Sequence, residues 1–402
     1  MPRLLAVLDR DGEEARVVGG AVRNALLGLS VDEIDVATTA LPEEVARRVE
    51  AAGFKAVPTG ITHGTITVVI GGHPFEVTTL RQDVETYGRH AKVEFGRDWA
   101  GDAHRRDFTI NAFSVTRDGA VHDYVGGLAD LEARRVRFIG EARARIEEDY
   151  LRILRFFRFH AAYGHGHPDA EGLHACILAR DGLAKLSRER VRMETIKLLV
   201  ATRAAPTLAA MAEAGLLMPV IGGVPYRAGF ENVAKAEAAA GLKADATRRL
   251  GGLAVMIVED AERLWQRLRL TNAEHARLTA MAVNWRHLSS TMDEAAARAA
   301  LYRLKPDYFI DSAILAWARS PQSAHDAAWR ELVALPLRWT APEFPLKARD
   351  FLARGVERGP ALGEALRAAE AAWIAAGFPR DPDALDKIVL AATGGTGSSP
   401  SP

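Results

Sequence analysis

The sequence predicts an α+β domain at the amino terminus followed by an all-α remainder. Up to about residue 140, short β-rich runs alternate with turn signals. From about residue 141 the chain is rich in Ala, Leu, Arg and Glu with helical periodicity, and this texture continues to about residue 392. A chain of 402 residues also exceeds what one hydrophobic core usually organises. The predicted parts are a head (1–140), a helical neck (141–200), a helical body and tail (201–392) and a disordered end (393–402).

Individual elements of the head follow from local patterns. The β signal is carried by four runs, at residues 15–18, 65–70, 75–80 and 136–139. Gly71-Gly72 stands between the second and third runs, and this spacing predicts a tight hairpin. At the other end of the chain, GGTGSSPSP offers no side chains to bury, so we expect it to be disordered.

Composition places the chain among ordinary globular proteins. It is 48% hydrophobic and 26% charged, which argues against general disorder. The single cysteine, Cys176, excludes an intramolecular disulfide and any multi-cysteine zinc site, and it fits a reducing compartment. The apolar stretch 4–8 is too short for a signal peptide, and no later segment reaches about 18 uninterrupted apolar residues. We therefore expect a cytoplasmic protein that makes no use of a membrane.

Charge is balanced overall but clustered locally. The formal net charge is +0, so nucleic-acid binding cannot be inferred from bulk basicity. One stretch nevertheless concentrates arginine, the side chain suited to bidentate phosphate and base contacts, at Arg134, Arg135, Arg137, Arg143, Arg145, Arg152, Arg155 and Arg158. A solvated helix face paired with Glu141, Glu147 and Glu148 is an equally good explanation of the same residues.

A strand at 15–18 leads through Gly19 and Gly20 into a predicted helix that contains Arg23. Such a turn exposes backbone N–H groups, and with Arg23 these donors can hold a triphosphate. Without other signals, a glycine pair between strand and helix is more often only a turn.

Acidic residues follow this turn. Glu33 and Asp35 are two residues apart, and in a strand residues at that spacing point to the same face. Glu76 lies within another predicted strand and could bring a third carboxylate to the same place. Carboxylate oxygens are preferred ligands of Mg²⁺, and three acids beside a phosphate-holding turn suit two-metal phosphoryl transfer. Each acid alone would more commonly be an exposed loop charge.

Six segments together resemble one family, the class II tRNA nucleotidyltransferases and bacterial poly(A) polymerases of the polymerase-β-like superfamily. They cover roughly the first half of the chain and read GGAVRNALLGLSVDEIDVATTA (19–40), HGTITVVIGGHPFEVTTLR (63–81), RRDFTINAF (105–113), DYVGGLADL (123–131), EEDYLRILRFFRF (147–159) and LSRERVRMETIKLL (186–199). The resemblance implies a polymerase-β-like mixed-sheet head followed by an all-α neck, body and tail. It also implies addition of CCA to the 3′ end of tRNA from CTP and then ATP, with Mg²⁺ held by Glu33, Asp35 and Glu76.

Two other activities remain open at this point. A poly(A) polymerase or an A-adding tRNA enzyme would carry much the same head motifs. A catalytically silent RNA-binding relative is supported by Glu33, which stands where the family has aspartate, with Asp32 just before it. Asn24 also stands where the family often has aspartate, next to Arg23.

The resemblance assigns nucleotide recognition to further residues. Arg106 and Asp107 match the segment assigned to the ribose, and Asp149 and Arg152 match the base-reading segment. Arg155 is included among the predicted nucleotide-binding residues. The family's flexible loop, linked to the switch from C to A addition, corresponds to residues 81–104 and contains Asp83, Tyr87 and Arg89.

Base reading by Asp149 and Arg152 also has a direct chemical argument. Three residues apart, the two side chains would share one face of a helix. Aspartate accepts hydrogen bonds and arginine donates them, whereas cytosine and adenine present an amino donor beside a ring-nitrogen acceptor. A fixed pair could therefore accept CTP and ATP but reject UTP and GTP. An ordinary intrahelical salt bridge is the competing explanation.

Overall fold

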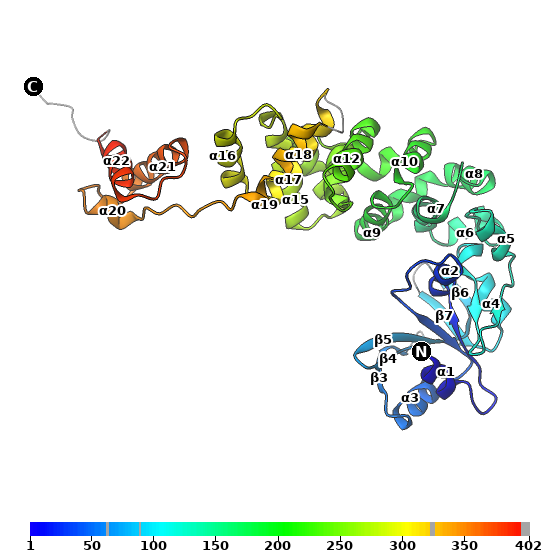
Figure 1. The fold of residues 1–402 in the computed structure, drawn as a ribbon. Helices are drawn as coiled ribbons and strands as arrows, with labels where there is room; N and C mark the ends of the chain where they lie inside the picture. The colour runs from blue at the N-terminus through cyan, green and yellow to red at the C-terminus, as the bar shows by residue number, and fades with distance from the viewer. Residues whose placement is uncertain (62–63, 88–89, 322–325, 395–402) are drawn as a thin grey trace, which may run out of the picture. The chain divides into compact units, whose positions relative to one another are not determined.

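The computed structural model describes residues 1–61, 64–87, 90–321 and 326–394 (Figure 1). By their contacts these residues form two compact units. The first unit is Met1–Pro225 with Arg267–Arg269, and the second is Tyr226–Gln266 with Leu270–Pro402. The finer division into head, neck and body stays a prediction, and most of the predicted disordered end lies outside the described residues.

The head is built on a seven-stranded mixed sheet, as predicted. Its strand order is β3-β4-β5-β2-β1-β8-β9. Strand β2 pairs with β5 in parallel, and the other pairs in this sheet are antiparallel. The strands are β1 (Ala15–Val18), β2 (Asp35–Thr38), β3 (Lys55–Gly60), β4 (Thr65–Ile70), β5 (His73–Thr79), β8 (Ser114–Val115) and β9 (Val121–His122). The predicted α+β class with an all-α remainder is confirmed.

The hairpin predicted at Gly71-Gly72 is also confirmed. Strands β4 and β5 are antiparallel, with Ile70 opposite His73. Both glycines have positive φ, 57° and 84°, which the two-residue turns favoured between such strands require. The turn therefore fixes the register that places Glu76 in β5.

One face of the sheet is covered by helices α1 (Pro2–Leu8) and α3 (Pro42–Ala51), which Figure 1 shows beside strands β3–β5. Val36 of β2 and Val77 of β5 are buried in this core. Because successive side chains of a strand alternate between faces, Asp35 and Glu76 are directed to the opposite face. The apolar pattern of the core thus decides which way the acids point.

Two sequence expectations for the head are corrected. Residues 81–104, expected to be a loop, contain a two-stranded antiparallel sheet of β6 (Arg81–Tyr87) and β7 (His90–Phe95), followed by helix α4 (Trp99–His104). The side chains of Asp83 and Tyr87 and all of Arg89 lie outside the described part of the chain. The run 136–139 forms no named strand and makes one isolated bridge, from Phe138 to Phe108.

Helices make up the rest of the first unit. They are α2 (Gly20–Leu26), α5 (Gly127–Glu132), α6 (Ala142–Glu148), α7 (Leu151–Tyr163), α8 (Ala170–Leu178), α9 (Arg188–Leu199), α10 (Ala204–Glu213) and α11 (Leu217–Ile221), with 3₁₀ segments η2 (Thr109–Asn111) and η3 (Arg180–Lys185). Cys176 in α8 is a free, fully buried thiol, as expected of a small apolar residue.

The named elements of the second unit, in its described part, are all helices, and irregular segments such as 339–347 join them. Its elements are α12 (Arg227–Ala239), α13 (Ala246–Ala254), α14 (Val258–Leu268), α15 (Asn272–Asn284), η4 (Trp285–His287), α16 (Glu294–Leu304), α17 (Pro306–Arg319), α18 (Ala327–Val333), α19 (Leu335–Arg338), α20 (Ala348–Leu352), α21 (Pro360–Ala375) and α22 (Pro382–Thr393). Among the described residues of the whole chain, no helix is long and apolar enough to cross a membrane.

Four helices of the second unit are joined by buried ion pairs. Asp311 of α17 is 1% exposed and accepts hydrogen bonds from Arg248 of α13 (3.0 Å) and Arg277 of α15 (2.6 Å). Arg248 also pairs with Glu237 of α12 at 2.9 Å, and Arg277 with Asp245 at 2.8 Å. Every charge in this group has an opposite partner, so the group fixes the relative positions of α12, α13, α15 and α17.

Buried His160 predicts how the first unit responds to acid. The residue lies on α7 and is 3% exposed; burial, with Arg203 nearby, lowers its pKa from 6.5 to about 4. Since the unfolded chain binds the proton more readily, the stabilisation is complete above pH 6.5 and is lost as pH falls toward 4. We expect His160 to account for a loss of about 3 kcal/mol of unfolding free energy over this interval.

The measurement is urea unfolding followed by circular dichroism at several pH values. The variant His160→Gln should show a smaller slope of stability against pH than the parent chain. The exposed His174 on α8 provides the control, because His174→Gln should leave the slope unchanged. Equal slopes for the parent and His160→Gln would contradict the assignment.

Candidate active site

A pocket of about 620 Å³ in the first unit brings the predicted site residues together. Ten of the eleven line it, and Glu76 does not. The predicted residues in the lining are Gly19, Gly20, Arg23, Glu33, Asp35, Arg106, Asp107, Asp149, Arg152 and Arg155. The remaining lining residues are Arg105, Asn111, Leu151, Arg158, Phe159, Arg190 and Lys197. Basic residues outnumber acidic ones two to one, so the pocket suits an anionic ligand.

The turn between β1 and α2 has the form that the sequence predicts. Gly19 adopts φ 73° and ψ −131°, a conformation that side chains rarely allow. A Cβ atom built there would come within 2.9 Å of Nη1 of Arg106. Glycine is therefore required both by the backbone and by the close approach of Arg106.

Arg23 is a buried cation held by neutral groups. It is 5% exposed, and its guanidinium donates to Tyr163 Oη (2.7 Å) and Asn24 Oδ1 (2.8 Å) and to Asn111 Oδ1. It also lies 3.8 Å from the centre of the Tyr163 ring. Burial, together with Arg158, lowers its pKa. Among the described residues Arg23 has no carboxylate partner, so its positive charge stays available to a ligand.

Two of the three predicted acids lie side by side. Asp35 and Glu76 are register partners in the parallel pair β2–β5. Asp35 has exposed surface, but partial loss of solvation by the surrounding protein raises the pKa of its carboxyl group, and the charges of Glu76 and Glu33 raise it further, against an opposing effect of Arg106. Such mutual repulsion is relieved when a cation binds.

Glu33 is placed differently from the sequence expectation. Strand β2 begins at Asp35, so Glu33 precedes the strand and strand alternation does not orient it. Asp32 is exposed and does not line the pocket. Within the described residues no group of three His, Cys, Asp or Glu side chains is close enough to form a metal site. The carboxylates in direct sheet register are therefore Asp35 and Glu76.

Arg106 and Asp107 do not pair with each other. Arg106 donates to Asp102 of α4 at 3.1 Å. Asp107 is buried, and it accepts from Arg155 at 2.7 Å and from Asn111 at 3.0 Å. Burial alone would raise the pKa of Asp107, but Arg155 and Asn111 bring it below the ordinary value. Asp107 thus joins the head to Arg155 of α7.

The expectation that Asp149 and Arg152 share one helical face is wrong. Helix α6 ends at Glu148 and α7 begins at Leu151, so Asp149 is in extended conformation between them. Its carboxylate accepts two hydrogen bonds from Arg190 of α9, at 3.1 and 2.5 Å. Arg152 donates instead to Glu148. Both side chains line the pocket, but separate partners hold them.

The segment between α6 and α7 packs against a glycine, Gly182. Tyr150 follows Asp149, and its ring lies against Gly182 of η3. A Cβ atom at Gly182 would stand 1.8 Å from Cδ1 of Tyr150, so no other residue fits without displacing the ring. This contact supports the short segment that carries Asp149.

Helix α9 supplies the residues that sequence reasoning missed. Arg190 holds Asp149, Glu194 accepts from Arg158, and Lys197 lines the pocket. Their spacing of four and three residues, which places them on one helical face, was the available signal. The arginine-rich stretch divides: Arg152, Arg155 and Arg158 line the pocket, whereas Arg143 is exposed and pairs with Glu147, as in the alternative explanation.

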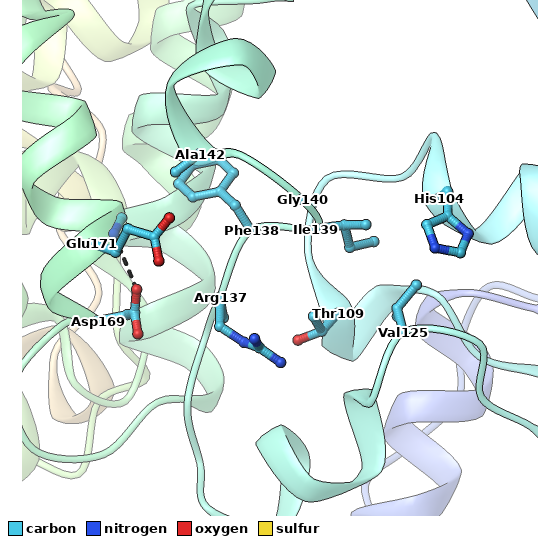
Figure 2. Close-up of a pocket in the computed structure, with 11 residues that line it drawn as sticks. His104, Thr109, Val125, Arg137, Phe138, Ile139, Gly140, Ala142, Asp169 and Glu171 are labelled. Atoms are coloured by element: carbon cyan, nitrogen blue, oxygen red, sulfur yellow. Dashed lines mark hydrogen bonds between the residues drawn. The ribbon is translucent and has the colours of Figure 1, made fainter.

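A smaller cavity of about 270 Å³ lies elsewhere in the first unit (Figure 2). In Figure 2, Asp169 and Glu171 stand at one side and His104 at the other. None of the predicted site residues lines it. Arg137 is bound to Asp130 at 2.9 Å, and Asp169 caps α8. Arg137 and Asp169 therefore have structural partners.

The fold and the larger pocket define a class, the nucleotidyltransferases with a poly(A) polymerase type of head. Two family models match the chain: "Poly A polymerase head domain" over residues 15–137, and "Probable RNA and SrmB- binding site of polymerase A" over residues 169–225. The first match spans the sheet and the turn between β1 and α2, and the second begins at Asp169, which caps α8.

Individual relatives narrow the class. The chain is 34% identical over 392 residues to CCA tRNA nucleotidyltransferase 1, mitochondrial, of Mus musculus, covering 95% of this chain and 88% of the relative. It is 40% identical over 218 residues to a CCA-adding enzyme of Leuconostoc citreum, covering 53% and 52%. The crystal structure of the Bacillus stearothermophilus CCA-adding enzyme in complex with CTP superimposes with a TM-score of 0.76 at 26% identity, covering 97% of this chain and 96% of that one. The chain belongs to the family of CCA tRNA nucleotidyltransferases and is an enzyme of that family.

Proposed function

We propose that this enzyme completes the 3′ end of tRNA by adding C, C and A, using CTP and then ATP without a nucleic-acid template. The observation that carries the proposal is the pocket itself. It combines the glycine turn between β1 and α2, an excess of basic side chains, and Asp149 with Arg152, the residues predicted to read the base. The named CTP, ATP and tRNA complexes of solved CCA-adding enzymes support the same choice of substrates.

The triphosphate is assigned to the turn and its cations. Gly19 and Gly20 allow close approach of an anion to the backbone, and buried Arg23 offers a charge that no carboxylate neutralises within the described residues. Lys197 lines the same pocket, and no ion pair of it is found in the described chain. These groups would hold and orient the nucleotide so that its α-phosphate faces the RNA 3′-hydroxyl.

Divalent cations are expected of the family, and we propose Mg²⁺. The residues fit the ion: Asp35 and Glu76 are hard oxygen donors in direct register, and Mg²⁺ is usually held by one or two carboxylates plus substrate phosphates. Glu33 is the third proposed ligand. When bound, the ions supply Lewis-acid stabilisation of charge on the attacking and leaving oxygens.

Sugar and base recognition are assigned to the boundary of head and neck. Arg106 and Asp107 would contact the ribose, with Arg155 held beside them. Asp149 would accept from the exocyclic amino group of cytosine or adenine. Within the described residues Arg152 is engaged only through Nη1, so Nε and Nη2 remain to donate to the ring nitrogen.

The wider assignments are proposals of the same kind. We propose that residues 1–140 form the catalytic head, 141–200 the neck with the base-reading segment, and 201–392 an RNA-binding body and tail. We propose the cytoplasm as the compartment, since a single buried cysteine fits reducing conditions, although the mouse and zebrafish relatives carry mitochondrial names.

Two alternatives to CCA addition were left open by the sequence. A poly(A) polymerase or an A-adding enzyme would use the same head, and it is excluded only by cytosine incorporation. The hypothesis of a catalytically silent RNA-binding homologue was based on Glu33. Asp35 and Glu76 form an acidic pair that does not depend on Glu33, which weakens that hypothesis.

The experiment incubates the purified chain with Mg²⁺ and tRNA ending before CCA, before CA or before the final A, each with one nucleotide. We expect CTP alone to extend the first substrate by two residues and the second by one, and ATP alone to extend only the third. UTP and GTP serve as controls and should extend none. Addition of A without C, or long A tracts, would establish the alternative.

A further inference from the structure

Asp149, proposed to read the base, lies at the break between helices α6 and α7. Arg145, which is outside the pocket, bridges that break. Helix α6 ends at Glu148, and Asp149 has φ −153° and ψ 105° before α7 begins. Continuous helical hydrogen bonding therefore does not fix the segment. Arg145, on the last turn of α6, does not line the pocket, and its side chain is 13% exposed.

Arg145 binds toward the neck through one nitrogen. Its Nη1 donates to both carboxylate oxygens of Glu148, at 2.7 and 2.5 Å. The same carboxylate accepts from Nη1 of Arg152, and Arg152 also donates to the backbone oxygen of Arg145 at 2.7 Å. Glu148 thus pairs with two arginines and ties the position of Arg152 to that of Arg145.

Through its other terminal nitrogen Arg145 binds the head. Nη2 donates to the backbone oxygen of Arg106 at 2.7 Å and to that of Arg105. The next residue, Asp107, holds Arg155 and Asn111. One planar guanidinium therefore connects the segment assigned to the ribose with the segment assigned to the base, a geometry that lysine cannot reproduce.

We propose that Arg145 is a positioning residue for nucleotide selection, which sets the distance between the Arg106–Asp107 segment and Arg152 without touching the nucleotide. The inference rests on the proposed function, because selection has meaning only if CTP and ATP are the substrates. Displacement of a recognition group by about 1 Å can cost on the order of a hundredfold in rate. Loss of the bridge should therefore weaken selection more than it weakens folding.

The test compares Arg145→Lys and Arg145→Met with the parent chain in C addition to tRNA ending before CCA. The measured quantity is kcat/KM for CTP divided by kcat/KM for UTP. We expect this ratio to fall by roughly 10- to 100-fold, with a raised KM for CTP and an unchanged KM for tRNA. Asp149→Ala, which removes a proposed base-reading group, is the reference for relaxed discrimination.

A matched control is available two residues away. Arg143 is on the same helix, is 63% exposed and pairs only with the exposed Glu147 within the described chain, so Arg143→Gln should keep the parent ratio. Glu148→Gln breaks the bridge from the other side and should also lower the ratio. Because both changes disturb one network, their effects in the double variant should fall short of additive.

The outcomes separate cleanly. Lower activity with an unchanged CTP-to-UTP ratio would make Arg145 structural and overturn the proposal, as would loss of the folded circular dichroism signal in every variant at position 145. A lowered ratio in folded Arg145→Lys, with Arg143→Gln unaffected, supports it. Failure of the parent chain to add C at all would reject the proposed function instead.

Discussion

The variant Asp35→Asn is expected to lower kcat for both C and A addition by about a thousandfold. Asparagine keeps the size of the side chain but removes the charge that faces Glu76 across the parallel pair β2–β5. The paired acids would then no longer attract a divalent cation, which we expect to stabilise the developing charge by about 4 kcal/mol. Single-turnover rates at saturating nucleotide and tRNA, measured over a range of Mg²⁺ concentrations, provide the measurement.

Two controls distinguish a catalytic role of Asp35 from a general effect of losing an acidic residue. Asp32 is exposed and outside the pocket, so Asp32→Ala should be the mildest of the changes at Asp32, Glu33 and Asp35. Binding of tRNA in the absence of metal should be the same for the parent and Asp35→Asn, because no step of RNA binding is assigned to this carboxylate. A fast Asp35→Asn enzyme would remove Asp35 from the chemistry.

The second large effect concerns stability. We expect Asp311→Ala to lower the unfolding free energy of the helical unit by about 3–5 kcal/mol and its melting temperature by roughly 10 °C. The change removes a carboxylate that is 1% exposed and leaves Arg248 and Arg277 with one acidic partner each. In the parent chain each of these arginines pairs with two carboxylates, one of which is that of Asp311.

Tryptophan fluorescence follows the unfolding of the second unit with little signal from the first unit. Six of the seven tryptophans belong to the second unit, and Trp99 alone belongs to the first. The control is Glu331→Ala, which breaks an exposed pair with Arg338 and should change stability by about 1 kcal/mol or less. Similar melting temperatures for Asp311→Ala and Glu331→Ala would show that the buried pairs contribute little.

Local patterns were sufficient for much of the head. The β-rich run at 65–70 identified β4, and Gly71-Gly72 identified the hairpin that follows it. That Asp35 and Glu76 lie side by side was expected only as a possibility, since pairing between residues 41 positions apart depends on the whole sheet. Strand β6 was missed because charged and polar residues dominate its sequence. Strand β7, HAKVEF, alternates polar and apolar residues, so a strand signal was present there and was not used.

The proposed base-reading residues show where spacing misleads. Three residues between Asp149 and Arg152 suggested one helical face, but the helix is interrupted between them. The partner of Asp149 is Arg190, which is 41 residues further along the chain and belongs to another helix. No periodicity within one segment can reveal such a contact, because it depends on how α9 packs against α7.

The seat of Tyr150 on Gly182 carries a consequence for fidelity. Any side chain larger than hydrogen at residue 182 must push aside the ring of Tyr150, the residue next to Asp149. We therefore expect the accuracy of CCA addition to depend on Gly182, a residue to which no contact with nucleotide or RNA is assigned. Inherited changes there could yield tRNAs with wrong termini while every group in the pocket is still present.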